Sequence, residues 1–244
     1  SKKRYVGMLY EFDHNKGNMK YMGLSLKRRD SCDYLKDTYG EILNILMKEH
    51  DLEKSIDYLN NCLDDLVNGR VPMDKLSITR ALRSDYKNPS QIAHRVLADR
   101  IGQRDPGNKP KPGDRIKYVF IDTQSPKSLL GDRIETPEYI VENKMKIDYN
   151  YYITNQLMKP LQQLYGLALE TIWANRNKRG LIKEYKKDME KMAKDYEHDF
   201  EAYTKAREKY CSARVKTILF DGVLTKINND RANLKSITSF FKKF

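Results

Sequence analysis

Lysine and arginine residues cluster in several short segments of this 244-residue sequence. With 46 Lys and Arg against 34 Asp and Glu, the formal net charge is +12. An excess of this sign favours association with a polyanion through counterion release, but it does not choose between DNA, RNA and anionic lipid. The residues that stand out are Lys2-Lys3-Arg4-Tyr5, Lys27-Arg28-Arg29, Arg80, Arg95, Arg100, Arg104 and Arg115.

The thiols are arranged unlike those of a metal site or a disulfide framework. Cys32, Cys62 and Cys211 are too few and too far apart in the sequence, because both kinds of site need clustered cysteines. No segment approaches the roughly 18–20 uncharged apolar residues of a membrane span, and the basic N-terminus lacks the apolar stretch and cleavage site of a secretory signal. We expect an intracellular protein with reduced thiols and no membrane partner.

The segment before residue 31 is rich in β-forming residues. Residues 4–12 and 19–26 have an extended pattern, and residues 13–18 between them have the composition of a turn. This pattern predicts a β-hairpin. Because a lone hairpin is unstable in water, we expect it to belong to a sheet whose other strands lie elsewhere, so that the chain begins in the middle of a domain.

Helical periodicity begins at Asp33 and predicts two antiparallel helices, joined near Asp51, before Gly69. A third helix is expected to begin at Asn88-Pro89, where asparagine can cap and proline suits the first turn. The rest of this part is expected to comprise an irregular loop over 104–114, a short strand over 115–121, a loop-like segment over 124–141, and helices around 149–156 and 160–173.

The last third of the sequence has a different pattern. Between Ile182 and Tyr210 apolar residues recur at heptad-like spacing, interrupted by Asp199 and surrounded by Lys and Glu. This stripe predicts a long helix packed along a neighbour, or a short coiled coil. The alternative interpretation is that the aromatic residues are packing surface and the charges are a solvated face.

A series of motifs, in their order and spacing, closely resembles the C-terminal palm and thumb of family B DNA polymerases. Eukaryotic polymerase delta and its relatives in large DNA viruses are the most similar members, and the resemblance covers about residues 2–173. The motifs are Lys2-Lys3-Arg4-Tyr5 and residues 23–30, 77–82, 86–100, 104–107, 113–119, 147–153 and 156–161.

The resemblance implies a role for the first two basic clusters. Lys2, Lys3 and Tyr5 would lie on the palm against the newly paired primer end, and Arg4 and Tyr5 would hold primer phosphates. A lysine at that point can reach the minor-groove acceptors that every correct pair displays, so it senses pairing without reading sequence. The cluster at 27–29 would lie where the chain leaves the palm for the thumb.

In the thumb, which grips the duplex behind the active site, the resemblance implies phosphate contacts by arginines. These are Arg80, Arg95, Arg100, Arg104 and Arg115. His94 is interpreted as a packing or phosphate-side residue rather than a catalyst. We expect Asp30, Asp105 and Asp114 to orient neighbouring arginines rather than bind metal.

The family's two catalytic aspartate motifs, Asp-x-x-Ser-Leu-Tyr-Pro and Tyr-Gly-Asp-Thr-Asp-Ser, do not occur in this sequence. These carboxylates hold the two metal ions of phosphoryl transfer, expected to be Mg²⁺ in the complete polymerase. We therefore expect no catalytic residue, metal or cofactor on this chain, and no activity from it alone. A missing segment or a partner chain of a split polymerase would supply the aspartates.

The sequence ends with Ser236-Ile237-Thr238-Ser239-Phe240-Phe241-Lys242-Lys243-Phe244. Terminal aromatics seldom reach a core, and the pattern Ile-x-x-Phe-Phe resembles the box that docks on sliding clamps. Its anchors would be Ile237, Phe240 and Phe241, although the usual glutamine is replaced by Leu234. The alternative is a frayed helix end.

Together these observations predict an α+β protein. Its expected parts are the C-terminal part of a palm (1–31), a mostly helical thumb (32–173), a helical extension (174–233) and a clamp-binding tail (234–244). The expected partners are primer–template DNA, the remaining part of the polymerase and a sliding clamp, in the nucleus or a viral replication compartment. The alternative function is a non-catalytic module that binds DNA and tethers a clamp, and an RNA-binding protein is disfavoured because no motif offers a stacking sheet.

Overall fold

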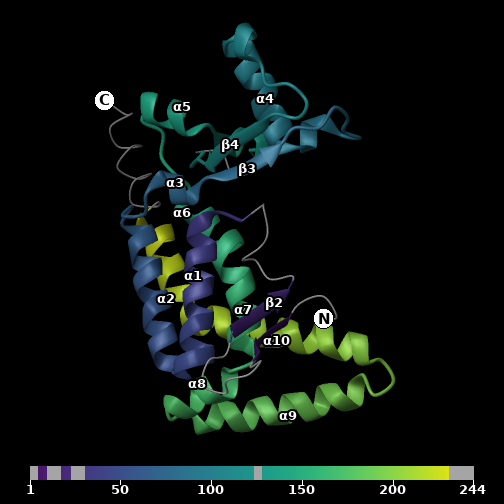
Figure 1. The fold of residues 1–244 in the computed structure, drawn as a ribbon. Coiled ribbons are helices and arrows are strands. Elements are labelled where there is room, and N and C mark those ends of the chain that lie inside the picture. Colours follow the sequence, from purple (N-terminus) through teal and green to yellow (C-terminus); the bar gives the residue numbers. More distant parts are fainter. Residues whose placement is uncertain (1–4, 10–17, 23–30, 124–127, 231–244) are drawn as a thin grey trace, which may run out of the picture. The chain divides into compact units, whose positions relative to one another are not determined.

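A computed structural model of the chain describes residues 5–9, 18–22, 31–123 and 128–230. The chain divides into two compact units, one formed by residues 1–41 and 65–156 and the other by residues 42–64 and 157–244. The first contains all the described strands, and in the second the described elements are helices (Figure 1). The predicted α+β class with a mostly helical C-terminal part is therefore confirmed, whereas the palm, thumb, extension and tail boundaries stay predictions.

The predicted N-terminal hairpin is present. Strands β1 (Tyr5–Leu9) and β2 (Asn18–Met22) pair antiparallel, from Tyr5 opposite Met22 to Leu9 opposite Asn18. The turn between them lies outside the described residues.

A three-stranded antiparallel sheet forms the centre of the first unit, in the order β3 (Ile78–Ala81), β4 (Arg115–Phe120), β5 (Ile134–Glu135). The strand predicted over 115–121 is thus confirmed. Ile116 and Tyr118 are buried and alternate with the exposed Arg115 and Lys117, as expected for a stretch of strand with one solvated face.

Helices α4 (Ala93–Arg104) and α5 (Pro137–Glu142) contact this sheet. The first unit also contains α3 (Met73–Leu76) and α6 (Tyr149–Tyr151), with 3₁₀ turns η3 (Pro89–Gln91), η4 (Pro106–Asn108) and η5 (Leu130–Arg133). Aromatic residues join β4 to the segment around α6. The Phe120 ring stacks on Tyr151 with 3.5 Å between centroids, and the Phe120 N–H donates to the buried Tyr152 hydroxyl at 3.0 Å.

Two helices run between residues 33 and 69, as predicted, and both contribute residues to each unit. They are α1 (Asp33–Asn44), extended by the π-helical turn η2 (Ile45–Glu49), and α2 (Leu52–Val67). His50 between them has the left-handed φ of 54°, and Asp51 begins α2 by accepting the Lys54 N–H at 2.9 Å.

Two predictions about the first unit were wrong in detail. The third helix begins at Ala93, not at Asn88-Pro89, because Ile92 is extended (φ −98°, ψ 103°) and residues 89–91 form a separate 3₁₀ turn. The segment 124–141 is not a loop over its described part, 128–141, which holds η5, β5 and α5. Thr136 caps α5 by accepting the Tyr139 N–H, and Pro137 occupies its first turn.

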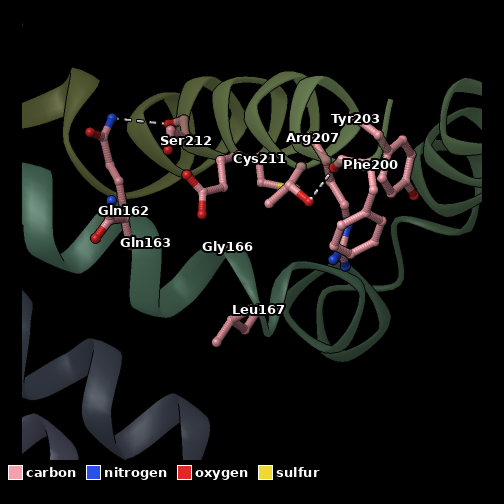
Figure 2. Close-up of a pocket in the computed structure, with 11 residues that line it drawn as sticks. Gln162, Gln163, Gly166, Leu167, Phe200, Tyr203, Arg207, Cys211 and Ser212 are labelled. Carbon is pink, nitrogen blue, oxygen red and sulfur yellow. Dashed lines mark hydrogen bonds between the residues drawn. The ribbon is translucent and has the colours of Figure 1, made fainter. Parts of the chain in front are cut away.

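The second unit continues with η6 (Tyr152–Met158, shared with the first unit), α7 (Lys159–Gly166), α8 (Leu169–Asn175), α9 (Arg179–Asp195), α10 (Phe200–Leu219) and a helical segment over 221–230. Helices α7 and α10 pack closely because Gly166 has no side chain. A Cβ there would lie 3.2 Å from the Cβ of Cys211. A cavity of about 310 Å³ lies between these helices (Figure 2).

The apolar stripe between Ile182 and Tyr210 is not one long helix. Helix α9 ends at Asp195, and Asp199 begins α10 by accepting the Ala202 N–H at 2.9 Å. The two helices pack against each other antiparallel, since Glu184 pairs with Arg214 and Asp188 with Tyr210. The stripe does pack along a neighbour, and that neighbour is its own second half.

Among the described residues, no helix combines the length and the apolar character needed to cross a bilayer.

Candidate nucleic-acid interface

A basic groove lies beside the end of α4 and the outer part of β4. It has a volume of about 640 Å³ and is lined by residues of the loop between them, by α5 and by its cap residue Thr136. We call it the basic groove because four cationic side chains line it, from Lys109, Lys111, Arg115 and Lys117. Asp114 and Glu138 are the acidic residues of its lining.

Two carboxylates fix the shape of the loop in this groove. Asp105 accepts the Gly107 N–H at 3.1 Å and the Asn108 side-chain amide at 2.6 Å. Asp114 accepts the Lys111 N–H at 2.7 Å. The prediction that Asp105 and Asp114 orient arginines was wrong, because within the described residues these hydrogen bonds go to the loop itself; Asp30 lies outside those residues.

Strand β4 holds two of the groove's cations on one face. Arg115 lies opposite Ala81 and Lys117 opposite Thr79 in the antiparallel register, and residues two apart in a strand share a face. Lys117 donates to Asp74 at 2.6 Å, which lowers the pKa of that carboxyl. Arg115 is exposed and has no carboxylate partner in the described part of the chain.

The loop supplies the other two cations. Lys109 lies 3.6 Å from Asp99 of α4. Lys111 is exposed, and its ammonium group has no ion pair within the ranges that the structure describes. Among the residues that the structure describes, Lys111 and Arg115 are therefore the two groove cations without an ion-pair partner.

A second basic cluster surrounds His94 near the start of α4. The Tyr86 hydroxyl accepts the Arg83 N–H at 2.8 Å and is hydrogen-bonded to His94 Nε2 at 3.0 Å. Burial lowers the pKa of the His94 imidazole, and the charges of Arg80 and Arg83 lower it further. His94 is thus half-buried and held by Tyr86, and the neutral imidazole adds no charge to the cluster.

The next arginine of α4 is Arg95, which is paired on the same helix. Its Nε atom lies 3.0 Å from Asp99 Oδ2, and its side chain is 28% exposed. Asp99 thus has two cationic neighbours, Arg95 and Lys109.

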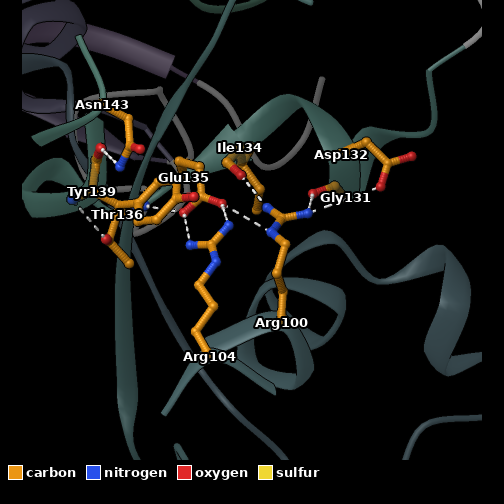
Figure 3. Close-up of polar contacts among 9 residues, drawn as sticks. All are labelled: Arg100, Arg104, Gly131, Asp132, Ile134, Glu135, Thr136, Tyr139 and Asn143. Atoms are coloured by element: carbon orange, nitrogen blue, oxygen red, sulfur yellow. Dashed lines mark hydrogen bonds and ion pairs between the residues drawn. The ribbon is translucent and has the colours of Figure 1, made fainter. Parts of the chain in front are cut away.

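Arg100 and Arg104 point to a buried carboxylate, as Figure 3 shows. Glu135 Oε1 accepts from Arg100 Nε at 2.9 Å and from Arg104 Nη2 at 2.6 Å, and the Glu135 side chain is 3% exposed. Arg100 also donates to the carbonyl oxygens of Gly131 and Ile134. Both arginines therefore join α4 to the segment that contains β5.

Arg104 has a further contact in this network. Its guanidinium carbon lies 3.5 Å from the centroid of the Tyr139 ring on α5. The hydrogen bond to Glu135 raises the pKa of Arg104, so the guanidinium group stays protonated.

Sequence reasoning missed Glu135 and a second buried carboxylate, Asp148. Arg133 donates to Asp148 at 2.8 Å, and Asp148 also accepts the Tyr151 N–H at the start of α6. A usable signal was Thr136-Pro137-Glu138, a cap followed by proline and an acid, which predicts a helix start directly after Glu135.

Of the predicted DNA-binding residues, the structure brings Arg115 into the basic groove and Arg80 into the cluster around His94. Tyr5 is described only as the first residue of β1. The remaining predicted residues of the palm and the tail lie outside the described residues, namely Lys2, Lys3, Arg4, Lys27, Arg28, Arg29, Ile237, Phe240 and Phe241. In the described ranges no group of three or more His, Cys, Asp or Glu side chains could hold a metal ion.

Comparison with known proteins gives a consistent result. The profile of a family described as DNA polymerase family B matches residues 1–167. A DNA polymerase of Pyramimonas orientalis virus is 43% identical over 243 residues, which covers 99% of this chain and 20% of that protein. A DNA polymerase of Acanthamoeba polyphaga mimivirus is 46% identical over 176 residues, or 70% of this chain and 10% of that protein.

A eukaryotic relative is also similar. The DNA polymerase delta catalytic subunit of Candida albicans is 34% identical over 166 residues, or 68% of this chain and 16% of that protein. The chain thus spans a fifth or less of the length of these relatives. The alignment of 243 residues with the first viral protein has to include the segment beyond residue 167.

Proposed function

Since this chain belongs to DNA polymerase family B, we propose that it is the palm and thumb part of such a polymerase. In this proposal residues 1–31 belong to the palm and residues 32–173 to the thumb. The thumb grips the primer–template duplex during templated DNA synthesis, and the basic groove holds the phosphate backbone.

One observation above all supports the phosphate contact. Lys111 and Arg115 carry charges that no carboxylate offsets within the described residues, and they lie in a groove whose loop is held by Asp105 and Asp114. Lysine and arginine that contact phosphates release counterions and bind without regard to base sequence. That property suits a protein that has to hold every template.

The proposal also gives the five predicted thumb arginines unequal roles. Arg115 and Arg80 are exposed, whereas Arg100 and Arg104 donate to Glu135 within the chain. We expect the first two to contact phosphates, and Arg95, which is paired with Asp99, to add a weaker contact. Arg100 and Arg104 act chiefly by holding the fold.

Chemistry would come from outside this chain's sequence. We propose that the two aspartate motifs and the Mg²⁺ ions that they hold belong to a missing segment or a partner chain. The tail residues Ile237, Phe240 and Phe241 would dock on a sliding clamp, and the site of action would be the nucleus or a viral replication compartment.

A binding experiment tests the groove. The affinity of the chain for a fluorescein-labelled duplex is measured by anisotropy over a range of KCl concentrations. The double variant Lys111→Gln/Arg115→Gln is expected to lower the slope of log affinity against log salt by about two, since each phosphate contact contributes about 0.9. Binding of the wild type should vary little with base sequence.

The matched control removes one lysine and one arginine that are already paired. Arg70 is paired with Asp65 at 2.8 Å, and Lys75 is paired with Asp37. The variant Arg70→Gln/Lys75→Gln therefore makes the same change in net charge and should leave the slope almost unchanged. Equal slopes for the groove variant and the wild type would refute the proposed groove contact.

Primer extension separates the proposal from its alternative. The chain alone should incorporate no nucleotide with Mg²⁺ and primer–template, and addition of the segment or chain that carries both aspartate motifs should restore synthesis. A non-catalytic DNA-binding and clamp-tethering module would show no such restoration.

A further inference from the structure

Helix α9 separates its charges between two faces. On the face toward α10, Glu184 accepts from Arg214 at 2.9 Å and Asp188 accepts from the Tyr210 hydroxyl at 2.8 Å. Tyr185 is buried between them, and its ring contacts Tyr210. These two acids are therefore engaged within the helix pair.

The face turned away from the buried Tyr185 carries a row of lysines, which we call the α9 stripe, and Glu184 lies at its edge. Its members are Lys183, Lys187, Lys191 and Lys194. At 3.6 residues per turn they fall within an arc of about 80°, and at 1.5 Å per residue the row is about 16 Å long. All four are exposed, and in the described part of the chain none has an ion pair.

Widening the arc to about 120° adds one further cation and one acid. Arg179 and Glu190 lie just beyond the edge of the stripe that Lys183 marks, so in the wider arc five cations minus one acid leave four net positive charges. The neighbouring Lys186 lies outside the arc and is 3.8 Å from Glu170 of α8. The unneutralised charge is thus confined to one face of α9.

The composition of this face indicates the kind of partner. The large apolar residues of α9, including Tyr185, Met189 and Met192, lie outside the arc and are buried or half-buried. A helix that lies on a membrane needs apolar residues to insert beside its cations, and a protein interface needs buried anchors. A row of lysines without apolar neighbours suits a linear polyanion.

We propose that the α9 stripe is a second phosphate-binding surface for duplex DNA. It lies beyond residues 1–167, the part that matches the polymerase family. The choice of DNA as the ligand rests on the proposed function, whereas the surface itself is independent of the basic groove. Lysine suits this role because its ammonium group is a point charge that contacts phosphate without a fixed geometry.

The test compares two fourfold variants of the full chain that have the same net charge. The stripe variant is Lys183→Gln/Lys187→Gln/Lys191→Gln/Lys194→Gln. The control variant is Lys54→Gln/Lys186→Gln/Lys205→Gln/Lys216→Gln, which changes four lysines of the same unit that are each paired with a carboxylate. Circular dichroism first establishes that both variants keep the helical content of the wild type.

We expect the stripe variant to lower the salt slope for a labelled duplex by about 3.6, or 0.9 for each of four phosphate contacts, and the control variant by less than one. Glu190→Gln, which removes the only acid of the arc, should tighten binding. Equal losses in the two fourfold variants would mean that only total charge matters, and this would overturn the inference. An unchanged slope in the stripe variant would overturn it as well.

Two further comparisons distinguish failure of the proposed function from failure of the inference about the α9 stripe. If the wild type does not bind the duplex, the proposed function fails and the inference fails with it. If the wild type binds and only the groove variant loses slope, the inference alone fails. Flotation with phosphatidylserine vesicles tests the other polyanion, and a stripe variant that loses vesicle binding but keeps its DNA slope would overturn the inference.

Discussion

Replacing Glu135 by glutamine removes a buried charge that two arginines share, and it keeps the size of the side chain. Breaking a buried ion pair by removing one partner costs about 3–5 kcal/mol. Here the carboxylate is 3% exposed, but the side chains of Arg100 and Arg104 are 23% and 33% exposed, so water stabilises them in the variant. We therefore expect a loss of about 2–3 kcal/mol of local stability.

Hydrogen exchange measures this loss where it occurs. Each 1.4 kcal/mol is about a factor of ten, so amides of α4 and β4 should exchange roughly 30- to 150-fold faster in Glu135→Gln. The fluorescence of Trp173, the single tryptophan, reports on the second unit and should not change. The control Glu142→Gln changes an exposed carboxylate of α5 and should leave exchange within a few-fold of the wild type.

The opposite result would refute the reasoning. If α4 exchanges at the wild-type rate in Glu135→Gln, the buried carboxylate does not hold Arg100 and Arg104 in the fold. Tighter DNA binding by the same variant would then indicate that the two arginines had been released toward phosphates.

Three further predictions concern His94, the start of α10 and the tail. Because the pKa of His94 is lowered in the fold, the unfolded chain binds its proton first as the pH falls. The stability contributed by neutral His94 is thus fully present above pH 6.5, the usual pKa, and is lost as the pH falls through the lower pKa of the folded state. In urea titrations, the free energy of unfolding should therefore decline less with acid in His94→Gln than in the wild type. Asp199→Ala removes the cap of α10 and should lower the free energy of unfolding by about 1 kcal/mol, whereas Asp199→Asn should keep most of the stability that the cap provides. Urea denaturation followed by Trp173 fluorescence measures both variants. Phe240→Ala with Phe241→Ala should abolish stimulation of processive synthesis by a sliding clamp in the complete polymerase and leave distributive synthesis intact, and undiminished stimulation would exclude a clamp anchor.

Local patterns sufficed for several elements. The hairpin at 5–22, the helices between residues 33 and 69 and the strand β4 follow from alternation, periodicity and turn residues within their own segments. The prediction for α4 was displaced because Asn88-Pro89 starts a 3₁₀ turn, and the extended Ile92 separates that turn from the helix.

The sequence pattern does not reveal ion pairs between residues that are far apart in the chain. Arg100 and Arg104 look like phosphate ligands when only their own motif is considered, since their carboxylate partner lies 31–35 residues away. Asp199 visibly interrupts the apolar stripe, but an aspartate in a charged segment does not reveal whether it continues a helix or caps the next one. Lys111, a cation of the basic groove, belongs to none of the motifs described for the sequence.

The loop of the basic groove has a consequence for how this protein can change over evolution. Asp105 and Asp114 hold the loop mainly through backbone N–H groups, of Gly107 and Lys111, which every residue except proline has. Its path is therefore largely independent of the exposed side chain at position 111. Substitutions there can tune the strength of the grip on its ligand, and hence how long the protein stays bound, without a cost in folding.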